Sequence, residues 1–182
     1  MNEFNLIEQA KKGDQKAFEQ IFTAQNKQLY HTAYSYVHNR EDTLDIIQET
    51  ACIAYLSINK LRKNEYFGTW LTRILINEAY KVLRKKKPNL VDLKDNEMDS
   101  IATLSDFGDN RMMIEVGLKG MRENYQTVIR LYYFRDYSIK EIADIMRRPE
   151  STVKTYLRRA KQKLRENLEE VSHEGFSISE HE

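Results

Sequence analysis

The chain has 182 residues and a net charge of +1, with only six Gly, two Pro and one Cys. Few glycines and prolines, together with many charged residues, favour long helices over β-sandwiches and barrels. A single cysteine excludes an internal disulfide, and the sequence contains neither a metal-ligand spacing nor an apolar run long enough to cross a bilayer. These features predict an all-α protein of the cytoplasm that uses no metal and no cofactor.

The first predicted helix follows Gly13-Asp14, where the aspartate suits a helix cap. Its apolar residues recur at helical spacing: Phe18, Ile21, Phe22, Leu29, Tyr30, Ala33 and Val37. A second helix is predicted to begin near Asn39, with four residues turned inward: Leu44, Ile47, Ala51 and Tyr55. Its other side carries a stripe of Asp45, Gln48, Glu49 and Cys52. This stripe is either an ordinary solvent face or a docking surface for basic and amide groups of a partner protein.

A third helix is predicted from about Gly68 to Lys86, after a turn at residues 62–65. It is expected to bury Trp70, Leu71, Ile74, Leu75 and Val82, and its polar face aligns Arg73, Asn77, Lys81 and Arg84. Residues 58–87 contain nine bases and two acids. A basic block of this kind is typical of a nucleic-acid surface, although cations at a helix C-terminus also favour the macrodipole.

Pro88 ends the helical pattern, and residues 88–110 contain six acids and one Lys. This composition predicts a flexible acidic linker. We therefore expect two small helical domains at residues 1–87 and 111–172, joined by the linker at 88–110. A tail follows at residues 173–182, and the sequence leaves its order open.

The C-terminal block predicts helices at about 112–121, 124–135, 138–146 and 151–169. Ser138 and Glu141 form a capping-box pattern, and a short helix followed by a longer basic helix is typical of a helix-turn-helix. Residues 151–165 contain six bases and no acid. The exposed side of the last helix offers candidate DNA contacts at Ser151, Thr152, Lys154, Thr155, Arg158, Arg159 and Lys161.

These motifs carry a family resemblance. Residues 138–146 and 149–160 together resemble the promoter-reading C-terminal domain of extracytoplasmic-function sigma factors of the sigma-70 family, with Arg147 and Ser151 standing where that family often has glycine. Residues 41–50 look like the family's polymerase-binding helix, in which Asp45, Gln48 and Glu49 match the docking positions.

Residues 67–84 are similar to the family's helix that reads and melts the start-proximal (−10) promoter element. The loop before it occupies the place where the family captures an unstacked base of the non-template strand. The resemblance therefore implies start-proximal DNA contacts at Arg62, Lys63, Asn64, Arg73, Asn77, Lys81 and Arg84. Tyr66, Phe67 and Trp70 are candidate stacking partners, but the apolar positions of Phe67 and Trp70 favour a core role.

The resemblance implies a non-enzymatic factor that directs bacterial RNA polymerase to promoters and assists promoter melting, in an envelope or stress response. Its partners would be core RNA polymerase, the duplex upstream (−35) element, the melted non-template strand and an anti-sigma factor that can be membrane-bound. The leading alternative is a stand-alone helix-turn-helix regulator, and a helical adaptor without a nucleic-acid role is a third reading. An enzyme is least favoured because no catalytic constellation is present in the sequence.

Overall fold

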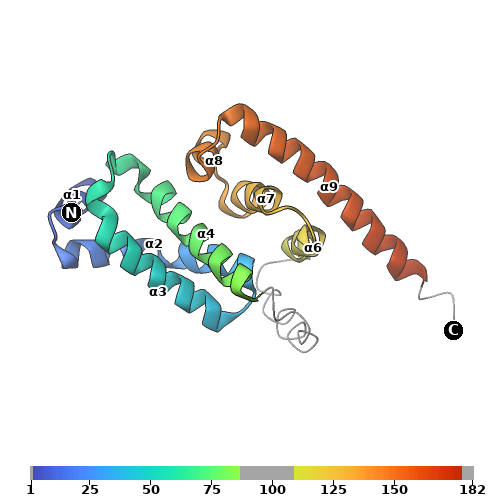
Figure 1. The fold of residues 1–182 in the computed structure, drawn as a ribbon, viewed down its shortest axis with the longest axis horizontal. Helices are drawn as coiled ribbons and strands as arrows, with labels where there is room; N and C mark the ends of the chain where they lie inside the picture. Colours follow the sequence, from blue (N-terminus) through green and yellow to red (C-terminus); the bar gives the residue numbers. More distant parts are fainter. Residues whose placement is uncertain (1, 87–108, 178–182) are drawn as a thin grey trace. The chain divides into compact units, whose positions relative to one another are not determined.

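A computed structural model describes residues 2–86 and 109–177, which form helices and turns without a strand among them (Figure 1). The chain forms two compact units, with the division between Lys94 and Asp95. The predicted all-α fold with two helical domains is confirmed. Most of the predicted acidic linker, residues 88–108, lies outside the described residues, and its last two residues begin a helix.

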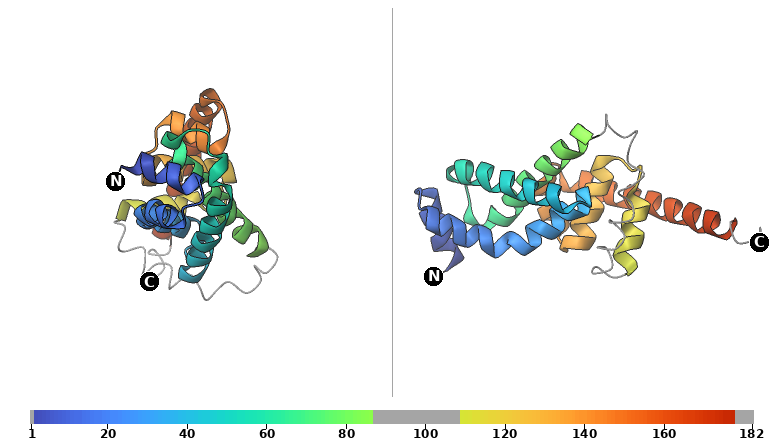
Figure 2. Two further views of the ribbon diagram at one scale, coloured as in Figure 1. Left: turned by 90° about the vertical axis from the view of Figure 1, so that its left-hand side faces the viewer. Right: turned by 90° about the horizontal axis from the view of Figure 1, so that it is seen from below.

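In the N-terminal unit, the described residues 2–86 form four α-helices and two short 3₁₀ turns. These elements are α1 (Glu3–Lys11), α2 (Gln15–Val37), α3 (Arg40–Ser57), η1 (Ile58–Lys60), η2 (Asn64–Tyr66) and α4 (Phe67–Lys86). Helices α2, α3 and α4 all pack against one another, and α1 packs against α2 and against both 3₁₀ turns. Figure 2 shows this unit from two further directions. The unit is thus a three-helix core with a short N-terminal helix that covers the connection between α3 and α4.

Side-chain caps set the starts of these helices. The Asp14 carboxylate accepts a hydrogen bond from the Ala17 amide at 3.1 Å, and the Asn39 side chain accepts one from the Asp42 amide at 3.0 Å. Both predicted starts are therefore confirmed. Helix α1 was not predicted from the sequence; it is short and buries only Ile7 and Ala10. Two buried residues in nine give too weak a period to mark a helix.

The predicted inward face of α3 is wrong. Of its four residues, Leu44 and Tyr55 are exposed, and Ile47 and Ala51 are half-buried. The helix instead buries Thr43, Ile46, Thr50 and Ala54. The two threonines can be buried because each hydroxyl donates to the carbonyl four residues earlier, at 2.6 Å for Thr43 and 2.7 Å for Thr50. Three small side chains let α3 approach its neighbours closely, and this outweighs the larger apolar area of the other side.

The expected interior of α4 is partly confirmed. Leu71 and Leu75 are fully buried, whereas Trp70, Ile74 and Val82 are half-buried. Phe67 is 1% exposed, which confirms its predicted core role. Helix α4 therefore fixes the N-terminal core and leaves one side for polar residues.

In the C-terminal unit, residues 109–177 form the helices α6 (Asp109–Leu118), α7 (Glu123–Arg135), α8 (Ile139–Met146) and α9 (Glu150–Ser177). Helix α9 packs against the other three. It runs eight residues beyond the predicted end at 169, so that residues 173–177 of the predicted tail are helical and residues 178–182 lie outside the described part.

A buried ion pair joins α6 to α7. The Arg130 guanidinium donates to the Glu115 carboxylate at 2.7 Å and to the Gln126 side chain at 2.8 Å, and both charged side chains are less than one-tenth exposed. On the other side of α6, the Asn167 amide of α9 donates to the Gly117 carbonyl at 2.7 Å. An added Cβ at Gly117 would lie 2.5 Å from a methyl carbon of Leu164, so a larger residue would force that side chain to shift. These contacts build a frame that carries the α8–α9 pair.

Candidate nucleic-acid and protein-binding surfaces

The turn between α8 and α9 has the geometry of a helix-turn-helix. Both halves of the predicted capping box are formed: the Ser138 amide donates to Glu141 at 2.8 Å, and the Glu141 amide donates to the Ser138 hydroxyl at 3.3 Å. Arg147 ends α8 with φ of 51°, in the left-handed region that favours glycine. The Arg148 amide then donates back to the Ala143 carbonyl at 3.0 Å. The turn therefore forms with arginine at the glycine position, at a cost of about 1–2 kcal/mol.

Apolar residues hold the two helices of this motif together. Ile142, Ile145 and Ala143 of α8 are buried, and so are Val153 and Leu157 of α9. Ala143 is the small residue that allows a close helix crossing. This packing leaves the opposite side of α9 to solvent.

The exposed side of α9 carries most of the predicted upstream DNA contacts. Ser151, Lys154, Arg158 and Arg159 are exposed, and Thr152 and Thr155 are half-buried. The Thr155 hydroxyl donates to the Ser151 carbonyl at 2.9 Å, which holds this side chain against the helix. The structure thus brings six of the seven residues onto one surface in the first turns of α9.

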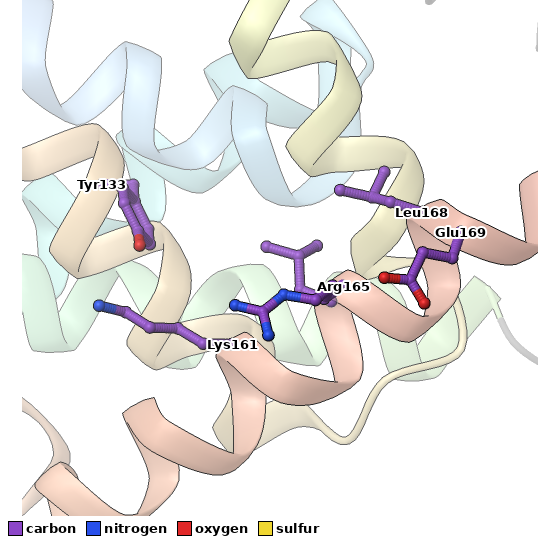
Figure 3. A pocket seen from close by; sticks show the side chains of 6 residues that line it. Tyr133, Lys161, Arg165, Leu168 and Glu169 are labelled. Carbon is purple, nitrogen blue, oxygen red and sulfur yellow. The ribbon is translucent and has the colours of Figure 1, made fainter. Parts of the chain in front are cut away.

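Lys161 lies at the edge of that surface and has other partners. Its ammonium lies 5.0 Å from the ring centre of Tyr132 and 5.5 Å from that of Tyr133. Figure 3 shows Lys161 beside a groove of about 360 Å³ that is lined by Tyr133, Lys161, Leu164, Arg165, Leu168 and Glu169. The sequence did not indicate this groove, because its walls come from two helices.

In the N-terminal unit, α4 presents the predicted basic face. Asn77, Lys81 and Arg84 are exposed, and Arg73 is half-buried. The Lys81 ammonium binds Glu78 at 2.7 Å, and the Arg84 guanidinium lies 5.8 Å from the Tyr80 ring centre. Glu78 was not among the predicted site residues; its side chain is 11% exposed, and its carboxylate partly neutralises the positive charge of the basic face.

The basic end of α4 also contacts its own domain. The Lys86 ammonium lies 2.5 Å from the Asp42 carboxylate in the first turn of α3. This pair ties the last turn of α4 to the start of α3. The Lys86 ammonium is therefore already paired with a carboxylate of its own domain.

The loop before α4 divides its residues between solvent and interior. Arg62, Lys63 and Glu65 are exposed, whereas Asn64 is only 8% exposed. The Asn64 amide nitrogen donates to Glu8 at 2.7 Å, and its carbonyl oxygen accepts from Lys11 at 2.6 Å. Hydrogen bonds to the Glu8 carboxylate lower the pKa of Glu8, with Asn64 the largest cause and Lys11 the next. The structure turns Asn64 away from the solvent side on which Arg62 and Lys63 lie.

Aromatic residues border this loop. The Lys63 ammonium lies 5.7 Å from the ring centre of Tyr66, which is half-buried. The Trp70 ring lies 6.0 Å from that of Phe67 and remains partly exposed to solvent, so its expected core role is only partly met. Tyr66 and Trp70 are therefore partly accessible to solvent, and Phe67 is not.

On α3, the predicted stripe of Asp45, Gln48, Glu49 and Cys52 is accessible along its whole length. Apolar side chains flank it, with Leu44, Tyr55 and Leu56 exposed to 49%, 39% and 77%. Leu44 and Tyr55 were predicted to lie in the core, and no prediction was made for Leu56. The α3 docking face, as we call these seven residues, therefore combines carboxylates and an amide with apolar side chains, a composition suited to a protein partner.

The described residues offer neither a metal site nor a membrane span. No group of three His, Cys, Asp or Glu side chains in residues 2–86 and 109–177 has the arrangement of a metal site. Within the same ranges, no helix is both long and apolar enough to span a membrane.

Comparison with known proteins gives two family matches in the expected order. Residues 21–88 match the model of sigma-70 region 2, and residues 111–164 match that of sigma-70 region 4. The chain is 31% identical over 179 residues to the ECF RNA polymerase sigma factor SigW of Bacillus subtilis, covering 91% of this chain and 96% of that protein. It is 34% identical over 147 residues to the RNA polymerase sigma factor SigV of the same organism, covering 80% and 87%.

Solved structures share the fold. CnrH in complex with the cytosolic domain of CnrY has a TM-score of 0.70 at 22% identity, covering 92% of this chain and 97% of that one. The sigma factor RpoE in complex with the anti-sigma factor NepR from Bartonella quintana has a TM-score of 0.63 at 21% identity, covering 85% and 98%. With the two ordered family matches and a relative that is similar over nearly its whole length, the chain belongs to the extracytoplasmic-function family of sigma factors, which direct bacterial RNA polymerase to promoters.

Proposed function

We propose that this sigma factor binds core RNA polymerase through the α3 docking face, with Asp45, Gln48 and Glu49 as its polar centre. The observation that carries the proposal is the accessibility of these three side chains on one face beside Leu44, Tyr55 and Leu56. Apolar side chains supply burial in an interface, and the carboxylates and amide supply orientation. Three large exposed apolar side chains on the same face as the polar centre favour a docking surface over an ordinary solvent face.

In the same proposal, α4 and the loop before it bind and open the start-proximal element. Arg73, Asn77, Lys81 and Arg84 line one side of α4, and Arg62 and Lys63 lie at its N-terminal end. Opening DNA costs about 1.4 kcal/mol of stacking free energy per base-pair step. Tyr66 and Trp70 offer ring surface that stacks on an unpaired base, and the cations bind its phosphates, which together offset that cost. Asn64 enters the proposal as an anchor of the loop rather than as a direct contact.

Helix α9 is proposed to read the upstream element as duplex DNA. Its first turns would lie in the major groove, where Ser151, Thr152 and Thr155 can reach base edges. Lys154, Arg158 and Arg159 would neutralise phosphates. Lys161 is proposed as a peripheral contact because its ammonium already lies over two tyrosine rings.

We further propose the domain limits 1–87 and 111–172, with an acidic linker at 88–110, and action in the cytoplasm during an envelope or stress response. Two proteins that share the fold were solved with the cytosolic domain of CnrY and with the anti-sigma factor NepR. By analogy, an anti-sigma factor, membrane-bound or not, is a proposed inhibitor. All phosphoryl-transfer chemistry is left to the polymerase.

The test is run-off transcription from a pool of promoter-bearing genomic fragments with core polymerase. The wild-type protein is compared with the triple variant Asp45→Ala, Gln48→Ala and Glu49→Ala. The matched control is Glu19→Ala with Gln20→Ala, which removes an exposed carboxylate and an exposed amide from α2. New start sites that survive in the control and disappear in the triple variant are the expected result, and they also identify the promoter sequence.

Equal transcription by the triple variant would remove the docking face from the proposal. Tight and specific duplex binding without polymerase, combined with no stimulation of transcription, would instead favour a stand-alone regulator. Both results count only for variants whose helicity and midpoint of thermal denaturation match those of the wild-type protein.

A further inference from the structure

Two side chains of α1, Glu8 and Lys11, bind the Asn64 side chain in the loop before α4. We call these three residues the α1 clamp. Each member binds the other two. The Lys11 ammonium lies 3.1 Å from Glu8 Oε1 and 2.6 Å from Asn64 Oδ1, and Asn64 Nδ2 lies 2.7 Å from Glu8 Oε1. Asn64 Nδ2 also lies 3.5 Å from the Phe4 carbonyl.

The clamp joins segments that are far apart in the chain. Asn64 lies 53 residues from Lys11 and 56 from Glu8. Helix α1 packs against both 3₁₀ turns of the connection between α3 and α4, and the buried residues of that connection are Ile58, Leu61 and Asn64. The loop is thus fixed to α1 by side-chain hydrogen bonds as well as by apolar contact.

Anchoring Asn64 also sets the direction of its neighbours. Lys63 and Glu65, on either side of it, are exposed, and their charged ends lie 3.7 Å apart. Lys63 further lies over the Tyr66 ring. Because the loop is only a few residues long, a change in the Asn64 side chain would turn Lys63 and Tyr66 away from the positions that the structure gives them.

We propose that α1 is a positioning element for single-strand capture: the α1 clamp holds the loop in the shape that binds an unpaired promoter base. The inference rests on the proposed function of the loop and assigns α1 no contact of its own with DNA. Glu8, Lys11 and Asn64 are positioning residues. Pre-forming the loop lowers the entropy lost when the strand binds, and this raises affinity without a new contact.

The direction in which a Glu8 substitution changes the affinity for DNA tests the proposal. Removing an acid from a nucleic-acid-binding protein raises its affinity for DNA if long-range electrostatics dominates. If Glu8 acts by holding the loop, the same removal lowers affinity. The two mechanisms therefore predict opposite changes for Glu8→Ala.

The experiment uses the full chain bound to core polymerase. The probe is a fluorescent single strand that carries the non-template sequence of the start-proximal element found by run-off transcription. We expect Glu8→Ala and Asn64→Ala each to weaken its binding on the order of ten-fold, the scale of ~1.4 kcal/mol. Glu8→Gln keeps an oxygen that accepts from Asn64 and is expected to weaken binding by less than about three-fold, or ~0.7 kcal/mol. The matched control is Glu3→Ala, which removes the exposed carboxylate in the first turn of the same helix, outside the clamp.

Core-polymerase affinity and binding to the duplex upstream element are measured on the same samples, and both should stay within about two-fold of the wild type, well below the ten-fold step of ~1.4 kcal/mol. Unchanged or tighter single-strand binding by Glu8→Ala would overturn the proposal. A parallel loss of polymerase binding would also overturn it, because α1 would then support the whole domain rather than the loop. If the wild-type holoenzyme itself fails to bind the strand, the proposed function of the loop fails, which is a result distinct from failure of the clamp.

Discussion

The two places where the chain is proposed to grip promoter DNA are built in different ways. The helix-turn-helix takes its shape from contacts within one short segment: the Ser138–Glu141 capping box, the left-handed Arg147 and the Arg148 hydrogen bond to Ala143. The loop before α4 takes its shape from α1, more than fifty residues away. Local geometry of the first kind can be read from a sequence pattern, and non-local geometry of the second kind cannot.

The largest expected effect is on the stability of the C-terminal unit. It tests how far the helix-turn-helix depends on the contacts that join α6 to α7. Glu115→Ala leaves the Arg130 guanidinium buried without its carboxylate partner, and should cost the C-terminal unit about 3–5 kcal/mol of unfolding free energy. The matched control is Glu166→Ala, which breaks the exposed pair with Lys163 and should cost about 0–1 kcal/mol. Urea denaturation followed by circular dichroism measures both. A cost for Glu115→Ala as small as the control's would show that the frame is dispensable.

The next prediction separates the two DNA surfaces. Reversing the charge at Arg158 and Arg159 should weaken binding to the upstream element on the order of 100-fold and flatten its salt dependence, since removing one phosphate contact reduces the slope by ~0.9. Core-polymerase affinity should stay nearly unchanged, because these residues lie in the C-terminal unit. Fluorescence anisotropy over a salt series measures the first quantity, and competition for core polymerase the second. Loss of both activities together would contradict this division of labour.

A smaller effect tests the local turn. Arg147→Gly should stabilise the C-terminal unit by about 0.5–1 kcal/mol, because glycine adopts positive φ without the Cβ penalty but loses more entropy on folding. Arg148→Gly is the control and should not stabilise the unit, since Arg148 does not have positive φ. Thermal denaturation of both variants gives the comparison. A destabilised Arg147→Gly variant would mean that the arginine side chain contributes more than its backbone strain costs.

The smallest predicted effect concerns pH and the α1 clamp. The pKa of Glu8 is lowered in the folded protein from its ordinary value of 4.5, so the unfolded chain binds the proton more tightly. The stabilisation is therefore fully present above the ordinary pKa and is lost as pH falls through the folded value. The thermal midpoint of the wild type should exceed that of Glu8→Gln near neutral pH, and the difference should shrink in acid. A difference that grows toward acid pH would have the wrong sign.

Sequence reasoning succeeded where a few adjacent residues decide the outcome. The caps at Asp14 and Asn39, the capping box at Ser138 and the packing of the helix-turn-helix all follow from local hydrogen bonding and helical period. The basic side of α9 was predicted for the same reason, because a charged face needs no partner element to define it.

It failed on α3 and α1. On α3, a stripe with Leu44 and Tyr55 looked like the core side, yet the structure buries the stripe with Thr43 and Thr50. The larger apolar area of its side chains favours burial of the Leu44 and Tyr55 stripe. Close packing of small side chains, with both threonine hydroxyls hydrogen-bonded, favours burial of the other stripe and prevails in the structure. On α1, nine residues with two buried positions offered no period strong enough to recognise.

The sequence by itself determined the all-α class, the starts of the main helices, the separation of basic and acidic blocks, and the motifs that identify the family. These depend on composition and on neighbours within one or two helical turns. Only the tertiary structure decided which face of α3 is free to bind a partner, that Asn64 turns inward to α1, and that Lys161 lies over two tyrosines. Each of those depends on which surfaces meet when distant segments pack, and the free energy of that packing is a property of the pair of surfaces rather than of either segment alone.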